Sequence, residues 1–347
     1  MAAGAPVRDG LRARAGALRA FADAAFAAAE RAVTEPAADV LVAPGGVPVR
    51  LRIRGAEHAR RLLPALAPLT AASGTRPAID LIAFDGDLPR PPWGRGDYRP
   101  RDELRGYGDE ELEVAYNLVG ETLSLVDVPG GRALSWSRDP SRLPVWDTGA
   151  PLRTPLRWAL RGRGRHLVHA AVVGDARGGV LLAGVSGSGK STTALACALA
   201  GLGFTGDDFC VVEPGTPPVA HALYAIAKVD DAALALLPGL GDRVVWDERT
   251  PEGKTLVAPG AIARALPLRA IVLPHVGTRT GPLQPAVAAR ALLALAPSTL
   301  IQLPGSRPVD HAAIAELARA LPVFLLELGP DPAAVVAAVR GVLEDVA

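Results

Sequence analysis

In the first 150 residues, hydrophobic and polar positions repeat either at helical spacing or in strict alternation. The first pattern predicts helices and the second predicts strands. Apolar residues at helical spacing predict helices over 11–33 and about 56–68. Alternating positions predict strands, the first two joined as a hairpin through Gly45 and Gly46. The expected strands cover residues 40–42, 47–53, 78–84, 113–118, 123–126 and 133–136. Residues 1–150 are therefore expected to form an α+β domain.

After Gly149 the pattern changes to short apolar runs separated by helical segments, which is typical of buried strands in an α/β sheet. The expected strands cover 169–173, 180–183, 209–212, 271–274, 299–303 and 323–327. The expected helices cover 192–202, 284–296, 309–320 and 331–345. A shorter helix is expected to begin with Thr154 as its cap and Pro155 as its first residue, and Asp310 is expected to cap the helix that follows it. The chain thus predicts a smaller α+β domain over 1–150 and an α/β domain over 151–347.

Composition narrows the function classes. The chain has 347 residues of which 49% are apolar, which is enough material for two domains. A net charge of +1 supplies no field that would attract nucleic acid, and charged residues interrupt the Ala-rich start too often for a membrane-spanning or signal segment. The two cysteines, Cys197 and Cys210, fit core positions in a reducing compartment. We expect a cytoplasmic protein with neither a nucleic-acid nor a membrane partner.

Residues 180–192 combine a buried strand with a glycine-rich loop and the start of a helix. Their spacing, Gly-x-x-x-x-Gly-Lys-Ser, lets successive backbone N–H groups point at phosphate oxygens. In such a loop Lys190 reaches the β- and γ-phosphates and the Ser191 hydroxyl binds Mg²⁺. A plain glycine turn is the alternative, but the strand and helix on either side favour a nucleotide site. The expected nucleotide-binding residues are Gly184, Ser186, Gly187, Ser188, Gly189, Lys190, Ser191 and Thr192, with ATP and Mg²⁺ as cofactors.

A pair of carboxylates, Asp207 and Asp208, follows 17 residues after Lys190 at the end of a short apolar segment. Adjacent residues on an extended chain point in opposite directions, so we expect two roles. One aspartate would hold metal-bound water and the other would accept the proton of an attacking hydroxyl. A loop-capping pair is the alternative. The position one connection away from the glycine-rich loop favours chemistry.

Three segments taken together resemble a known family. His169-Ala-Ala-Val-Val, the glycine-rich loop and Gly206-Asp-Asp-Phe-Cys-Val match in order and spacing the catalytic half of HPr kinase/phosphorylase. Relatives of that family include kinases of lasso peptide biosynthesis, and the match is best over 165–213. The resemblance implies a P-loop kinase fold, with Asp207 as general base, Asp208 and Ser191 at the metal, His169 tuning the base, and Lys190 completing the catalytic group.

Two departures from the family narrow the expected activity. The Gly- and Arg-rich second signature that HPr kinases carry after the aspartates has no counterpart, so we do not expect the reverse reaction. Residues 1–150 do not match that family's N-terminal domain, so HPr is not the expected acceptor. We expect a kinase that transfers the γ-phosphoryl group to a Ser or Thr hydroxyl of a peptide or protein, such as a lasso precursor peptide.

Two alternatives keep the same nucleotide site: a kinase for a small hydroxylated molecule, and a nucleotide-dependent switch without transfer. The N-terminal domain is assigned to acceptor recognition by elimination, and the resemblance allows a homo-oligomer. Lysine occurs only at positions 190, 228 and 254, and Lys228 and Lys254 are expected to be exposed loop residues rather than ligands. Arg153, Arg157 and Arg161 share one helix face, which is expected to be solvated. The five tryptophans, Trp146 among them, are expected to serve packing.

Overall fold

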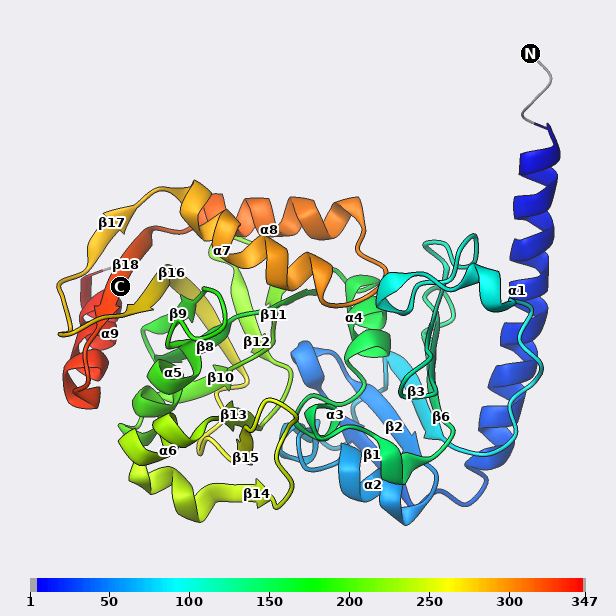
Figure 1. The fold of residues 1–347 in the computed structure, drawn as a ribbon, viewed down its shortest axis with the longest axis horizontal. Coiled ribbons are helices and arrows are strands. Elements are labelled where there is room, and N and C mark those ends of the chain that lie inside the picture. Colours follow the sequence, from blue (N-terminus) through cyan, green and yellow to red (C-terminus); the bar gives the residue numbers. More distant parts are fainter. Residues whose placement is uncertain (1–4, 346–347) are drawn as a thin grey trace.

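The computed structural model describes residues 5–345, with side chains from residue 12 onward, and it builds a six-stranded sheet from the N-terminal part of the chain (Figure 1). Its strand order is β1-β2-β3-β6-β5-β4. The strands are β1 (Ala38–Val42), β2 (Val49–Ile53), β3 (Ile79–Phe84), β4 (Leu112–Asn117), β5 (Thr122–Asp127) and β6 (Arg132–Ser137). Strand β3 runs parallel to both neighbours, and the hairpin through Gly45 and Gly46 is confirmed.

Helices cover both faces of this sheet, because each strand directs alternate side chains to opposite sides. Along β3, Phe84 faces α1 (Ala5–Ala32) in one apolar cluster. Leu81 faces the other side and packs with residues of α2 (Ala56–Leu62) and α4 (Arg153–Arg161). A short helix, α3 (Val145–Gly149), leads into α4. The expected α+β arrangement of this part of the chain is confirmed.

The second large sheet has nine strands and belongs to the C-terminal part of the chain. The strands are β7 (His166–Val168), β8 (Ala171–Asp175), β9 (Gly178–Leu182), β10 (Gly203–Gly206), β11 (Cys210–Glu213), β12 (Val219–Ala222), β16 (Ala265–Val276), β17 (Gln284–Ala286) and β18 (Val323–Leu328). Strand β16 is long enough to pair with β12 near its start and with β9 and β18 along the rest. It therefore joins the two parts of the sheet.

The direction of two strands decides where the candidate site forms. Strand β9 runs parallel to β16, whereas β8 is antiparallel to β9 and β10 is antiparallel to β8. Two reversals restore the direction, so β9 and β10 end at the same edge of the sheet. The glycine-rich loop follows β9 and the two aspartates follow β10. Both motifs consequently meet at one edge.

Helices cover this sheet on both faces as well. Helices α5 (Lys190–Leu199) and α9 (Pro332–Asp345) pack in one cluster with Val180 and Leu182 of β9. Helices α7 (Ala288–Ile301) and α8 (Pro308–Ala320) pack in another with Leu181. Beside α5 lies α6 (Asp231–Leu236) with a small sheet of β13 (Ala227–Val229), β14 (Val244–Trp246) and β15 (Thr255–Val257). The α/β architecture expected for 151–347 is present.

The two parts of the chain share a hydrophobic core. One cluster joins Leu51 of β2 and Leu160 of α4 with Val211 of β11, Leu256 of β15 and Leu303 after α7. The predicted boundary at residue 150 lies in the connection between α3 and α4, inside this contact region. It stays a prediction. No helix within residues 5–345 has both the length and the apolar character that crossing a bilayer requires.

Several local expectations were wrong. Residues 299–301 continue α7 past Pro297 instead of forming a strand, because a short apolar run fits a buried helix turn equally well. Helix α4 begins at Arg153, after Leu152 in a left-handed conformation, so Thr154 is not its cap. Asp310 lies inside α8, where its carboxylate accepts the backbone N–H of Arg307.

The arginine face of α4 is also not solvated. Arg157 is buried and donates to the carbonyl of Leu303, and Arg161 is paired with Glu113 of β4 and, at 2.9 Å, with Asp310 of α8. The helix contacts the first sheet on one side and the connection between α7 and α8 on the other, so this face lies between the two parts of the chain. The prediction failed because helical spacing shows which residues share a face and not what covers it.

Candidate functional site

The glycine-rich loop runs between β9 and α5 in the curled form that its sequence predicts. Gly184, Gly187 and Gly189 have positive φ angles, which L side chains rarely adopt. At Gly189 a β-carbon would also lie 2.3 Å from Leu328 Cδ1, so a larger residue would have to displace the Leu328 side chain as well as adopt the positive φ. Helix α5 starts directly after this glycine, and the free N–H groups of its first turn open into the loop.

Lys190 closes the loop on itself. Its ammonium donates to the carbonyl oxygens of Gly184 at 2.6 Å and Val185 at 3.1 Å, and the residue is only 7% exposed. Burial lowers the pKa of Lys190, while the nearby charges of Asp207 and Asp208 act in the opposite direction. A lysine held this way can exchange carbonyl oxygens for phosphate oxygens without a large movement of its stem.

Asp207 is buried and incompletely hydrogen-bonded. It is 3% exposed, its Oδ2 accepts the backbone N–H of Lys228 at 3.0 Å, and its Oδ1 has no hydrogen-bond partner. Burial raises the pKa of this carboxyl, the charge of Asp208 raises it further, and the adjacent Ser191 hydroxyl lowers it. A buried oxygen without a donor, beside the hydroxyl that opens α5, is the arrangement expected where a cation binds.

Asp208 has both carboxylate oxygens engaged. Oδ1 lies 2.9 Å from His169 Nε2, and Oδ2 accepts from the ammonium of Lys228 at 2.6 Å. Burial alone would raise the pKa of Asp208, but the hydrogen bond from His169 and the positive charge of Lys228 outweigh it and lower the pKa. Asp208 therefore stays ionised. His169 itself precedes β8 instead of beginning it, in the two-residue junction between β7 and β8.

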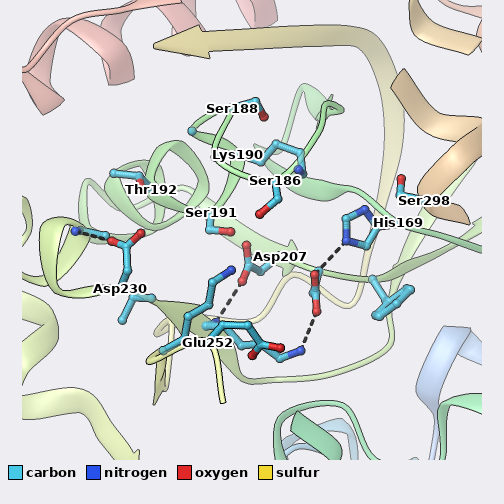
Figure 2. Close-up of a pocket in the computed structure, with 18 of the residues that line it drawn as sticks. His169, Ser186, Ser188, Lys190, Ser191, Thr192, Asp207, Asp230, Glu252 and Ser298 are labelled. Carbon is cyan, nitrogen blue, oxygen red and sulfur yellow. Dashed lines mark hydrogen bonds and ion pairs between the residues drawn. The ribbon is translucent and has the colours of Figure 1, made fainter. Parts of the chain in front are cut away.

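These groups line one cavity of about 490 Å³ at the edge of the sheet. Figure 2 shows Lys190, Ser191 and Asp207 near its centre, Thr192 and Asp230 toward one end, and His169 and Ser298 toward the other. All expected site residues except Gly184 line this cavity. Gly184 contributes the carbonyl that Lys190 holds.

The structure adds residues that sequence reasoning placed elsewhere. All three lysines of the chain line the cavity, so Lys228 and Lys254 are not merely exposed loop residues. Their scarcity was the signal that could have found them. The added lining residues are Trp146, Arg153, Phe209, Lys228, Val229, Asp230, Ala233, Glu252, Lys254, Ser298 and Gln302. Trp146 and Arg153 come from α3 and α4, and no local motif marks them.

The donor set fits a divalent cation bound with phosphate. Within residues 5–345 no group of three or more His, Cys, Asp or Glu side chains forms a metal site. Mg²⁺ commonly takes one or two protein ligands and completes its shell with phosphate oxygens and water. The Ser191 hydroxyl and the unpartnered Oδ1 of Asp207 meet that requirement. Asp208, the metal ligand that the resemblance implied, has both oxygens occupied by protein donors.

Charges in the cavity nearly cancel. Its cationic side chains are Arg153, Lys190, Lys228 and Lys254, and its carboxylates are Asp207, Asp208, Asp230 and Glu252. A triphosphate alone would place its negative charge next to the buried Asp207 and the half-buried Asp208, at a cost that grows in a low-dielectric site. The same triphosphate carrying Mg²⁺ brings the missing positive charge. The cavity therefore suits a metal–nucleotide complex better than a bare anion.

Comparison with known proteins adds little. No protein-family model and no curated protein matches the chain. Among solved structures, the HPr(Ser) kinase/phosphatase from Coxiella burnetii is aligned over 51% of this chain and 95% of its own, with 12% sequence identity and a TM-score of 0.28. At this TM-score the similarity supports no conclusion about fold or activity.

Proposed function

We propose that the protein is an ATP- and Mg²⁺-dependent kinase that phosphorylates a Ser or Thr hydroxyl of a peptide or protein. One observation carries the proposal: the glycine-rich loop with Lys190 shares a cavity with an aspartate–histidine dyad. In this dyad, Asp208 Oδ1 and His169 Nε2 are at hydrogen-bonding distance from each other. The loop supplies N–H groups and a cation for the phosphates, and the dyad supplies an ionised acceptor for a hydroxyl proton.

The reaction balances with these groups. The acceptor oxygen bonds to the γ-phosphorus, the bond from that phosphorus to the β–γ bridging oxygen breaks, and ADP leaves. The hydroxyl proton passes to a carboxylate of the pair. Phosphoryl transfer has a loose transition state, so the base must mainly orient the hydroxyl, and a carboxylate with a lowered pKa such as Asp208 serves for that.

The two aspartates take different roles in this proposal. The resemblance implied Asp207 as base and Asp208 at the metal, and the hydrogen bonds support exchanging the roles. Asp207 adjoins Ser191 and has a free oxygen, so these two would hold Mg²⁺, which neutralises charge on the phosphates when bound. Asp208 is held by His169 and Lys228 at the other end and would receive the proton on a second lone pair of one of its oxygens, since each carboxylate oxygen accepts from only one protein donor.

The acceptor class rests on the resemblance and on elimination. A precursor peptide of lasso peptide biosynthesis is the first acceptor to test, with the N-terminal domain as the recognition part. A kinase for a small hydroxylated molecule would use the same groups. A nucleotide-dependent switch would not need the Asp208–His169 dyad, and the dyad is the observation that favours a kinase over a switch.

The test is transfer measured by mass spectrometry, with ATP, Mg²⁺ and a library of Ser- and Thr-containing peptides that includes lasso precursors. Lys190→Ala should abolish transfer, and Asp208→Asn should lower it at saturating Mg²⁺ by on the order of 100-fold or more. Asp207→Asn should instead raise the Mg²⁺ concentration needed for half-maximal transfer. The exposed Asp242→Asn is the matched control and should change neither.

Each result bears on one part of the proposal. Steady ATP hydrolysis with no peptide phosphorylated would favour the switch. Transfer to a metabolite pool and to no peptide would favour the small-molecule kinase. An Asp208→Asn variant as active as the wild type, with an Asp207→Asn variant inactive at every Mg²⁺ concentration, would restore the roles that the resemblance implied.

A further inference from the structure

The cavity has two ends, which a bound triphosphate would distinguish. In a glycine-rich loop of this type the backbone cradles the α- and β-phosphates, while the lysine reaches the β- and γ-phosphates. Figure 2 shows Thr192 and Asp230 toward one end, and His169 and Ser298 toward the opposite end, with Lys190 and Asp207 between them. The dyad at His169 therefore marks the γ-phosphate end. An acceptor must enter from there.

Side chains from distant parts of the sequence build this end. The His169 and Phe209 rings are 5.3 Å apart, and the Arg153 guanidinium lies 6.0 Å from the Phe209 ring. The backbone N–H of His169 donates to Thr299 Oγ1 of α7 at 3.0 Å. These contacts hold α4, the β7–β8 junction and α7 together around the γ-phosphate end.

Helix α7 presents hydrogen-bonding groups to the opening. Ser298 and Gln302 are one helical turn apart and both line the cavity. A glutamine amide donates and accepts at once, as does a serine hydroxyl, so the pair matches the alternating N–H and C=O groups of an extended peptide. Arg153 is paired with Asp147 at 2.9 Å, so it adds little net attraction for an anion.

The N-terminal part of the chain completes the rim. Trp146 of α3 lines the cavity, and Arg101 reaches the carbonyl of Ile301 at the end of α7, at 3.5 Å. Asn117 donates to both carboxylate oxygens of Asp102 at 3.0 Å. The loops that carry these residues therefore lie beside the C-terminal end of α7. The opening is formed jointly by both parts of the chain.

Unusual backbone conformations gather in the same segments. Among the described residues, positive φ angles at non-glycine positions occur at Arg101, Asp102, Glu121 and Leu152. The first two belong to the loop that reaches Ile301, and Leu152 directly precedes Arg153. Such conformations cost free energy and persist where the surrounding structure holds them, often at binding sites.

Apolar side chains remain exposed on both sides of this rim. Ile301, at the C-terminal end of α7, is 57% exposed and lies one helical turn from Ser298. On the N-terminal side, Val119 is 94% exposed in the turn that follows Asn117. Exposed apolar groups on both sides of a polar opening suit a chain segment longer than a single residue.

We propose that the γ-phosphate end of the cavity is an acceptor subsite shared by both parts of the chain, and that its occupant is an extended peptide segment. Gln302 and Ser298 would bind its main chain, Trp146 would cover the acceptor residue, and Ile301 and Val119 would contact apolar side chains on either side of the hydroxyl. This inference rests on the proposed kinase activity and deepens it.

The test blocks the acceptor subsite with a covalent label and leaves the nucleotide-binding end of the cavity open. Gln302→Cys is labelled with a bulky maleimide, because both native cysteines are buried and burial raises the pKa of each thiol to about 12. Gln284→Cys is the matched control, because Gln284 is the only other glutamine of the chain and is exposed on β17, away from the cavity. Nucleotide affinity and transfer to Ser- and Thr-centred peptides of about seven residues, roughly 23 Å when extended, are measured before and after labelling.

Labelled Gln302→Cys should lose transfer by on the order of 20-fold or more and keep its nucleotide affinity within about twofold, while labelled Gln284→Cys keeps both. Equal transfer by the two labelled proteins would overturn the subsite, and so would loss of nucleotide binding at Gln302→Cys. A wild type that binds nucleotide and phosphorylates no peptide would instead overturn the proposed kinase activity, and the subsite with it.

A second measurement separates a peptide from a small acceptor. Ile301→Asp should weaken transfer to apolar peptides by about tenfold and leave transfer to N-acetylserine amide unchanged, because that compound is too short to reach the helix surface. Val244→Asp, at an exposed apolar position on β14 outside the cavity, is the control. N-acetylserine amide phosphorylated as well as every peptide, with no effect of Ile301→Asp on any substrate, would overturn the peptide assignment.

Discussion

Two buried aspartates of this protein have opposite surroundings. Asp310 on α8 is enclosed by positive and donating groups: Arg161 at 2.9 Å, His166 at 3.3 Å and the backbone N–H of Arg307 at 3.0 Å. Its burial would raise the pKa, but these partners outweigh it and lower the pKa to about 2. Asp207 has one backbone donor, a like charge beside it and a pKa raised by burial.

The different surroundings of Asp310 and Asp207 distinguish a carboxylate that stabilises the fold from one that is available to a ligand. Asp310 lies where the two parts of the chain meet, and each of its partners belongs to the protein, so its charge is neutralised by folding. Asp207 keeps one oxygen without a donor, so a bound cation or a proton must neutralise its charge. A buried carboxylate that the fold leaves unsatisfied is a better sign of a site than burial or charge alone.

The largest expected effect concerns Asp310. Asp310→Asn should lower the free energy of unfolding at pH 7 by on the order of 3 kcal/mol, because it leaves the buried Arg157 without a carboxylate partner and Arg161 with Glu113 alone. The pKa of Asp310 is lowered on folding, so its stabilisation is present above about pH 4 and is lost as the pH falls toward 2. The difference in free energy of unfolding between the wild type and Asp310→Asn, measured with denaturant, should therefore be smaller below pH 4 than at pH 7. An equal loss at both pH values would contradict the comparison.

Lys228 is expected to have the next largest effect, on activity. Its ammonium helps to lower the pKa of Asp208, so Lys228→Met should raise that pKa and move the acid limb of the pH–rate profile for transfer to higher pH. The rate at pH 7 should fall by about 30-fold. Lys254→Met is the control, since Lys228 and not Lys254 contacts Asp208. An acid limb that Lys228→Met leaves in place would show that the dyad does not carry the proton.

The smallest expected effect has the opposite sign. Because the pKa of Asp207 is raised on folding, its ionised form costs stability above the pKa of the unfolded chain, and Asp207→Asn should stabilise the protein at pH 7–8 by about 1 kcal/mol. The gain should shrink toward pH 4, where the unfolded carboxyl also binds a proton. Thermal unfolding without nucleotide measures it. A destabilised Asp207→Asn would place Asp207 with Asp310 as a structural residue.

The fold was predictable where elements are long or have a clear period. The hairpin through Gly45 and Gly46 and the α/β pattern after residue 150 follow from local signals. Residues 299–303 did not, because a segment with three apolar residues among five fits a strand and a buried helix turn equally, and α7 continues through Pro297. Asp310 looked like a cap because sequence shows its neighbours along the chain and not those across the domain contact.

The site residues also fall into those that sequence motifs predict and those that only the fold brings together. The loop around Lys190 and the aspartate pair are contiguous motifs, and strand directions bring them to one edge of the sheet. Lys228 and Arg153 come from elements whose approach depends on the whole fold, so their chemistry was not visible locally. The rarity of lysine is the one clue in the sequence that points to Lys228.

Lysine at only three positions, all of them in one cavity, also makes the chain a selective chemical target. An acylating nucleotide analogue that reacts with primary amines would find its side-chain targets within the cavity, and modification mapped by peptide mass would report which amine faces which phosphate. Protection by excess nucleotide would then give an occupancy measurement that needs neither a known acceptor nor turnover.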